Sequence, residues 1–106
     1  MIKALHRNTA PDVLRSIILR SLDQDKAQHI SLINLDGKSD MADYMVIASA
    51  TSQRHLASMA RHLQEKVAQI GMQSGVEGIP NSDWVVVDTP LVITHLFLRE
   101  AREHYD

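Results

Sequence analysis

The chain has 106 residues, a formal net charge of -2 and no cysteine. That length suits a single domain with its own core, and a hydrophobic share of 44% predicts a globular chain, neither disordered nor membrane-spanning. The slightly acidic balance argues against a surface built to coat nucleic acid. The absence of cysteine excludes disulfides, thiolate nucleophiles and cysteine-based zinc sites. The first residues lack the apolar segment of a secretory signal, so we expect a cytoplasmic protein.

The first part of the chain predicts one helix. Residues 1–8 have no persistent period, so we expect a loose N-terminal arm ahead of one domain spanning residues 9–106. Thr9 and Pro11 are typical of a helix start, because a hydroxyl accepts from an early backbone N–H and proline lacks a donor that would go unpaired. The apolar residues that follow are spaced by three or four and predict a helix that ends near residues 23–25.

Two strands and a second helix are predicted next. Residues 30–35 form a short apolar segment before a turn, and residues 44–48 are apolar on successive positions, as expected for a central strand covered on both faces. Thr51 and Ser52 offer caps for a helix whose apolar residues again recur by three or four, and Gly71 suits its end.

The last third of the chain predicts a β-hairpin. Residues 83–98 contain two arms rich in β-branched residues, and Pro90 between them suits the first central position of a tight turn. Residues 75–78 read as a short extended segment, 79–82 as the turn into the hairpin, and 99–105 as a terminal helix. The expected fold class is therefore α/β, with a mixed sheet of four to five strands and helices packed on it as layers.

The spacing of the residues gives little support for a metal site or for an enzyme active site. His55 and His62 lie about two turns apart on one helix, roughly 10 Å, which is too far to share one ion. No serine lies in a nucleophile motif and no phosphate-binding loop is present, so we predict neither a catalytic residue, a metal site nor a cofactor. The alternative from this class is a metal-dependent nucleotidyltransferase-like enzyme that would use Asp40, Asp43, Asp88 and His95.

A third hypothesis is direct RNA binding by Arg54, His55 and Arg61 on the second predicted helix. Cations in the first turn of a helix are mildly unfavourable for its dipole, which hints at a surface use for Arg54 and His55. The overall charge makes any nucleic-acid contact a minor one.

The hairpin carries two residues that favour a binding role. Trp84, the only tryptophan, has two open interpretations: it covers the edge of the core, or it is a partly exposed anchor for a partner. His95 lies inside the second arm, where a histidine is more commonly hydrogen-bonded within the sheet than catalytic.

Several segments together resemble one family, the ribosomal silencing factors, also called the Iojap family. The matching segments are Asp-Tyr-Met-Val-Ile at 43–47, Thr-Ser-Gln-Arg-His at 51–55, Gly-Val-Glu-Gly at 75–78, Asp-Trp-Val-Val-Val-Asp at 83–88, His95, and Arg102 with Tyr105. They run in the family's order over nearly all of residues 25–105. Two departures stand out: the family usually continues past the tyrosine into a further tail, and relatives often carry glycine and an acidic residue where this chain has Pro90 and Leu91.

The resemblance implies a non-enzymatic protein whose fold is similar to the nucleotidyltransferase fold without its catalytic residues. It implies binding to the large ribosomal subunit through its protein fourteen, which blocks subunit joining and represses translation when nutrients are limiting. It is also compatible with a homodimer and implies no membrane contact. The partner-binding residues expected on this basis are Trp84, Asp88, Thr89, Pro90, Leu91 and His95.

Overall fold

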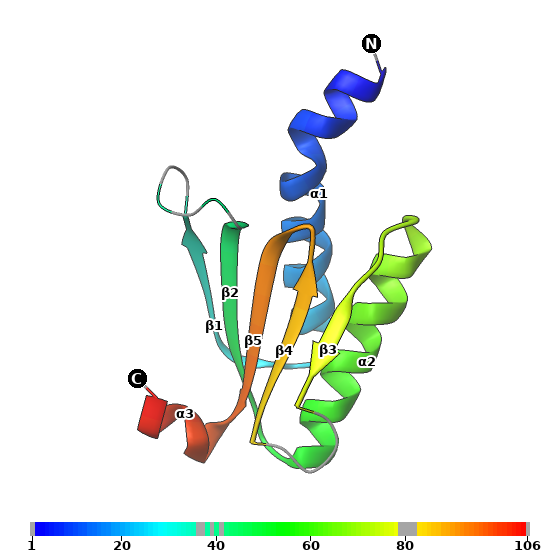
Figure 1. The fold of residues 1–106 in the computed structure, drawn as a ribbon. Coiled ribbons are helices and arrows are strands. Elements are labelled where there is room, and N and C mark those ends of the chain that lie inside the picture. The colour runs from blue at the N-terminus through cyan, green and yellow to red at the C-terminus, as the bar shows by residue number, and fades with distance from the viewer. Residues whose placement is uncertain (1, 36–37, 39, 41, 79–82, 106) are drawn as a thin grey trace.

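The computed structural model describes residues 2–35, 38, 40, 42–78 and 83–105, with side chains from residue 11 to residue 102 within these ranges. Eight elements follow one another along the chain (Figure 1): α1 (Ile2–Gln24), β1 (Gln28–Asn34), β2 (Ala42–Ala50), α2 (Gln53–Gln69), β3 (Gly75–Glu77), β4 (Trp84–Thr89), β5 (Leu91–Leu98) and α3 (Arg99–Tyr105). This order confirms the predicted elements, including the hairpin. The turns predicted at 36–37 and 79–82 lie outside the described residues.

The five strands form one mixed sheet in the order β1-β2-β5-β4-β3. β2 and β5 are parallel neighbours at its centre, whereas the other three pairs are antiparallel. The mixed α/β fold class and the central position of β2 are therefore confirmed.

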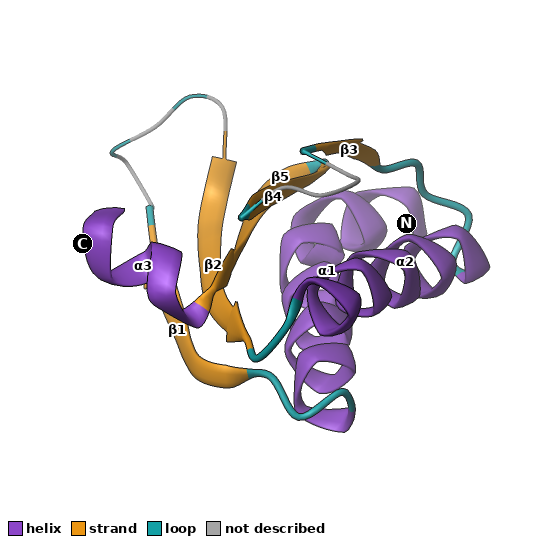
Figure 2. Ribbon diagram, turned by 90° about the horizontal axis from the view of Figure 1, so that it is seen from below, coloured by secondary structure: helices purple, strands orange, loops and turns teal. Residues whose placement is uncertain are grey.

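α1 and α2 cover the same face of the sheet (Figure 2). The core lies between them and the strands, and its members are fully or almost fully buried: Leu14, Ile18 and Leu22 from α1, Leu56, Met59, Ala60, Leu63 and Val67 from α2, and Val46, Ala48, Ala50, Val85, Val87, Val92 and Leu96 from the strands. On the helices these residues follow the predicted spacing of three or four, and on the strands they lie at every second position or a multiple of it, as expected for side chains on one face of a sheet. We call this side of the sheet the helix face.

Among the described residues, the opposite side of the sheet is covered only at one end, where α3 lies (Figure 2). This corrects the expectation that residues 44–48 are covered on both faces: Val46 and Ala48 are buried, whereas Met45 and Ile47 are only partly buried. Apolar residues on successive positions indicate a strand that needs cover on both sides, and here one of those covers is missing. We call this second side the open face.

α1 corrects a second expectation, because it begins at Ile2 and contains Pro11 instead of beginning near Thr9. Lysine, alanine, leucine and arginine ahead of the proline favour a helix, and this preference outweighs the start signal read from Thr9 and Pro11. Residues 2–8, which were expected to belong to a loose arm, are therefore helical, and this part of α1 extends past the end of the sheet (Figure 1).

The ends of α2 agree with the local signals in the sequence. The hydroxyl of Ser52 accepts the backbone N–H of His55 at 3.0 Å and so caps the first turn. At the other end Gly71 has a φ of 79°, and the N–H of Met72 reaches the carbonyl of Val67 at 3.2 Å. This is the usual glycine-terminated helix end, so Gly71 is confirmed as the stop.

Candidate partner-binding surface

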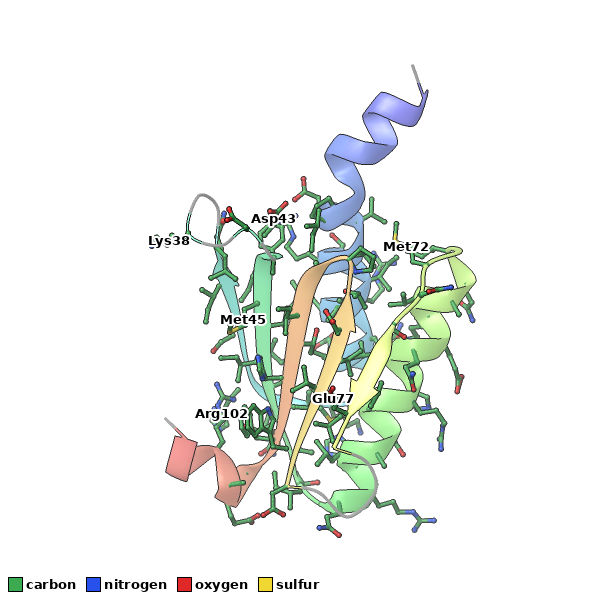
Figure 3. The ribbon with its side chains drawn as sticks, viewed as in Figure 1. Lys38, Asp43, Met45, Met72, Glu77 and Arg102 are labelled. Carbon is green, nitrogen blue, oxygen red and sulfur yellow. The ribbon has the colours of Figure 1, made fainter. Side chains whose placement is uncertain are left out.

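Strand register determines which side chains share the open face. Three rows run across the sheet, because side chains directly opposite one another on paired strands point to the same side. The first row holds Ile33, Met45, Ile93, Asp88 and Gly75; the second holds Ser31, Ile47, His95, Val86 and Glu77; the third holds Ser49, Phe97 and Trp84. Figure 3 views this face and labels Met45 on β2 and Glu77 on β3.

The middle of the open face is apolar. Ile33 is 40% exposed and Trp84 is 39% exposed, whereas Met45, Ile47, Val86 and Ile93 are partly buried by their neighbours. A contiguous apolar surface on a small protein is typical of an interaction site.

Trp84, His95 and Phe97 form an aromatic cluster at the α3 end of this surface. The Trp84 ring stacks on Phe97 with ring centroids 5.4 Å apart and on His95 at 5.7 Å. The indole Nε1–H donates to Nδ1 of His95 at 3.0 Å, so the neutral imidazole carries its own proton on Nε2. Burial lowers the pKa of His95, which favours this neutral form.

Charged residues lie at the border of the apolar surface. Asp88 on β4 and Glu77 on β3 are exposed and share the open face. At the opposite border Arg102 of α3 donates to the hydroxyl of Ser49 at 2.8 Å and to that of Ser31 at 3.4 Å (Figure 3). The border is therefore acidic on the β3 side, and on the β1 side the arginine fixes α3 in place.

The predicted contact residues at the hairpin turn differ in their exposure. Pro90 and Leu91 are exposed at the turn, and Leu91 has a φ of 65°, the left-handed region that favours glycine. Thr89 is only 5% exposed, and its hydroxyl donates to the carbonyl of Val92 at 2.8 Å. Thr89 follows the parity of the helix face, so its side chain points away from the open face.

A shallow hollow of about 520 Å³ lies beside the turn, and it is lined by Gln73, Ser74, Gly75, Asp88, Thr89, Pro90 and Leu91. The structure therefore separates the predicted site into two groups. Trp84 and His95 meet at one end of the hairpin, whereas Asp88, Pro90 and Leu91 gather at the other. Val86 lies between the two groups on β4.

The sequence prediction missed the apolar members of the open face, namely Ile33, Met45, Ile47, Val86 and Ile93. Two of them could have been found: Val86 has the parity of Trp84 on one strand, and Ile93 has that of His95 on the other. The other three required knowledge of which strands are neighbours.

The enzyme hypothesis gains no support from the described residues. Within residues 2–35, 38, 40, 42–78 and 83–105, no group of three or more histidine, aspartate or glutamate side chains could hold a metal ion. His95 is hydrogen-bonded to the indole of Trp84. Asp88 lies in the row of the sheet next to that of His95. Among the described residues, no three of Asp40, Asp43, Asp88 and His95 therefore form a group that could hold a metal ion.

The RNA hypothesis is also weakened. His55 accepts the backbone N–H of Thr51 on Nδ1 at 3.0 Å, so its proton lies on Nε2, which is 2.7 Å from the carbonyl oxygen of Asp25. The ring thus links the first turn of α2 to the residue that follows α1. Arg61 pairs with Glu65 on the same helix at 3.6 Å, so its charge is offset.

Comparison with known proteins identifies the fold and the family. The profile of the family described as "Ribosomal silencing factor during starvation" matches residues 7–106. The chain belongs to the ribosomal silencing factor family. A ribosomal silencing factor of Zymomonas mobilis is 44% identical over 97 residues, which cover 91% of this chain and 73% of that protein. We therefore interpret the open face in terms of the ribosomal silencing role of the family.

Two further similar proteins extend this result. A crystal structure of a Chromobacterium violaceum protein superposes with a TM-score of 0.86 at 25% identity, covering 90% of this chain and 80% of that one. The mouse protein named "Mitochondrial assembly of ribosomal large subunit protein 1" is 33% identical over 85% of this chain, which spans 41% of the mouse protein. In the described part of this chain, no helix is long and apolar enough to cross a membrane.

Proposed function

We propose that this ribosomal silencing factor uses the open face to bind the large ribosomal subunit through its protein fourteen. The bound factor occupies space that the small subunit needs, prevents subunit joining and so represses translation when nutrients are limiting. No catalytic step and no cofactor are part of the proposal. The family membership and the names of the relatives support a role at the large subunit.

One observation carries the proposal: β2 is apolar on successive residues, yet among its apolar side chains only those on the helix face are fully covered. Leaving Met45, Ile47 and Ile93 partly open to water has no structural benefit for an isolated chain, because each could gain further burial. A partner that covers the open face would supply the missing layer, as in an interface whose centre resembles a protein core.

The arrangement of side chains fits such an interface. Trp84 and the neighbouring apolar residues would form its centre, where tryptophan is over-represented among residues that dominate binding energy. Asp88 and Glu77 would lie at its border and favour hydrogen-bond donors or cations on the partner. An interface of about 1,600 Å² or less is sufficient, because the factor acts by occupying space.

Pro90 and Leu91 extend the proposed contact to the hairpin turn. Both are exposed and lie beside the hollow next to Asp88. Thr89 takes part only by holding the turn closed through its bond to Val92.

The experiment that tests the function is co-sedimentation of the protein with purified large subunits, with and without an excess of small subunits. We expect the protein to sediment with large subunits and to be displaced as small subunits are added. Binding that is unchanged by small subunits would contradict the steric mechanism, and no sedimentation with large subunits would contradict the partner. Sedimentation equilibrium of the protein without ribosomes tests whether it forms the homodimer with which the family resemblance is compatible.

A further inference from the structure

We propose that His95 is a positioning residue for Trp84: it holds the indole flat on the open face, in the orientation that the partner binds. The proposal rests on the function proposed above, and it assigns His95 a role through another side chain instead of a direct contact. Three observations carry it: the hydrogen bond between the two side chains, the stacking of three rings, and the place of Trp84 at the border of the sheet.

The hydrogen bond restricts the orientation of the indole ring by fixing its N–H group. The Nε1–H of Trp84 donates to Nδ1 of His95 at 3.0 Å, across two neighbouring strands. A tryptophan side chain at a strand end has two rotatable bonds, and its single polar atom is here tied to a ring fixed within β5. Because the neutral imidazole has one acceptor nitrogen, this bond also determines which nitrogen of His95 carries the proton.

The stacking also restricts the orientation of the indole ring, because it fixes the plane of the ring. The Trp84 ring lies nearly parallel to that of Phe97, with an angle of 12° between the planes, and at 27° to that of His95. Phe97 is 7% exposed and so forms a fixed base, whereas Trp84 keeps 39% of its surface exposed. The cluster therefore presents an ordered aromatic surface, and an ordered anchor loses less conformational entropy when it binds.

The surroundings of His95 disfavour protonation of Nδ1, the nitrogen that accepts the hydrogen bond. Ile47 and Val86 are its neighbours across β2 and β4, and burial lowers the pKa of the imidazole. The charged side chains on this side of the sheet are Asp43, Glu77, Asp88 and Arg102, and within the described residues none of them forms an ion pair or hydrogen bond with His95. Protonation of Nδ1 would remove the acceptor and release the indole.

The first arm of the test uses the free protein. Trp84 is the only tryptophan, so intrinsic fluorescence reports on it alone. His95→Leu removes the acceptor but keeps similar bulk, and we expect lower anisotropy and a shifted emission maximum for this variant. In the wild type the same change should appear as the pH falls through the lowered pKa of His95, whereas His95→Gln, which keeps an acceptor and cannot titrate, should show no such transition. Circular dichroism checks that each variant is folded.

The second arm measures affinity for purified large subunits in a double-mutant cycle. We expect His95→Leu to weaken binding about fivefold, equivalent to about 1 kcal/mol for one lost hydrogen bond, and His95→Gln to recover most of that loss. In the background of Trp84→Phe, which keeps a ring but has no N–H, His95→Leu should have no further effect.

Two outcomes would overturn the proposal. The first is an equal loss from His95→Leu in both backgrounds, which would make His95 a direct contact. The second is identical anisotropy in the wild type and His95→Leu, which would show that the indole is held by other means. A wild-type protein that does not bind large subunits would overturn the proposed function instead, and the fluorescence arm would still decide whether His95 orders Trp84.

Discussion

The two faces of the sheet are built from the same five strands but have different surroundings. On the helix face, Val46, Val85 and Val87 are no more than 1% exposed beneath α1 and α2. On the open face, the alternating neighbours Met45, Ile47 and Val86 stay partly exposed. Apolar character alone therefore does not distinguish a fold-stabilising face from a binding face, because both faces of β2 are apolar. The difference is whether the chain supplies its own cover.

The largest expected effect separates the two faces by stability. Leu63 is fully buried in α2 against the helix face, so Leu63→Ala should lower the free energy of unfolding by about 2–5 kcal/mol. Met45→Ala, on the partly exposed side of β2, should lower it by about 1 kcal/mol. Chemical denaturation of both variants measures these values. Equal losses would mean that the open face contributes to stability as the helix face does.

The second prediction concerns binding. Trp84→Ala should weaken binding to the large subunit by about 2 kcal/mol or more, because exposed tryptophans are over-represented among the residues that dominate binding energy. Ile70→Ala is a suitable control, since Ile70 is 40% exposed at the end of α2, away from the open face. Equal affinity of the wild type and Trp84→Ala would remove Trp84 from the interface.

The third prediction compares two neighbouring residues of β1. Ile33 and Leu32 are 40% and 42% exposed, yet their side chains point to opposite sides of the sheet. Ile33→Asp should weaken binding to the large subunit by about 1–2 kcal/mol, because it places a charge in an apolar contact. Leu32→Asp should leave binding unchanged at a similar cost in stability. If both substitutions weakened binding to the same extent, the assignment of the interface to one face would be wrong.

The fourth prediction concerns the turn that joins β4 and β5 at the edge of the proposed contact. Leu91 has a φ of 65°, which costs about 1–2 kcal/mol for a residue with a Cβ atom. Leu91→Gly should therefore be about 1 kcal/mol more stable than Leu91→Ala, which removes the same side chain but keeps the strained Cβ. Thermal unfolding of the two variants gives the difference directly, and equal stabilities would exclude strain at this position.

The smallest effect is a pH dependence of folding that originates on the open face. The folded-state pKa of His95 lies below its ordinary value because the ring is partly buried. The unfolded chain therefore binds the proton first as the pH falls, so the contribution of His95 to stability is complete above about pH 6.5 and is lost as the pH falls from there through the lowered folded pKa. Unfolding curves of wild type and His95→Gln across this range should diverge on the acidic side. Parallel curves would contradict this assignment.

Much of the fold could be predicted from the sequence, because its signals are local. The hydroxyl of Ser52, the stop at Gly71 and the two arms of the hairpin each act within a few residues, and all three predictions were confirmed. The start of α1 was missed because proline is compatible with both the first turn and, at a cost, the interior of a helix.

The candidate site could be predicted only in part. Strand parity already separates Trp84 and Asp88 from Thr89, so the buried position of Thr89 was within reach of the sequence. The open face itself was not, because it depends on α1 and α2 both packing on one side, and on β2 lying beside β5. Neither fact is encoded in a spacing along the chain.

The central parallel pair has a consequence for how the chain folds. It joins Met45 to Ile93, and α2, β3 and β4 lie between them in the sequence. Contacts between distant segments form slowly, because the intervening chain loses entropy before the contact stabilises it. We therefore expect α2 and the β4–β5 hairpin to form early and the middle of the sheet to close last. Until it closes, the helix face and the open face do not exist as separate surfaces, so the partner-binding surface is a late product of folding.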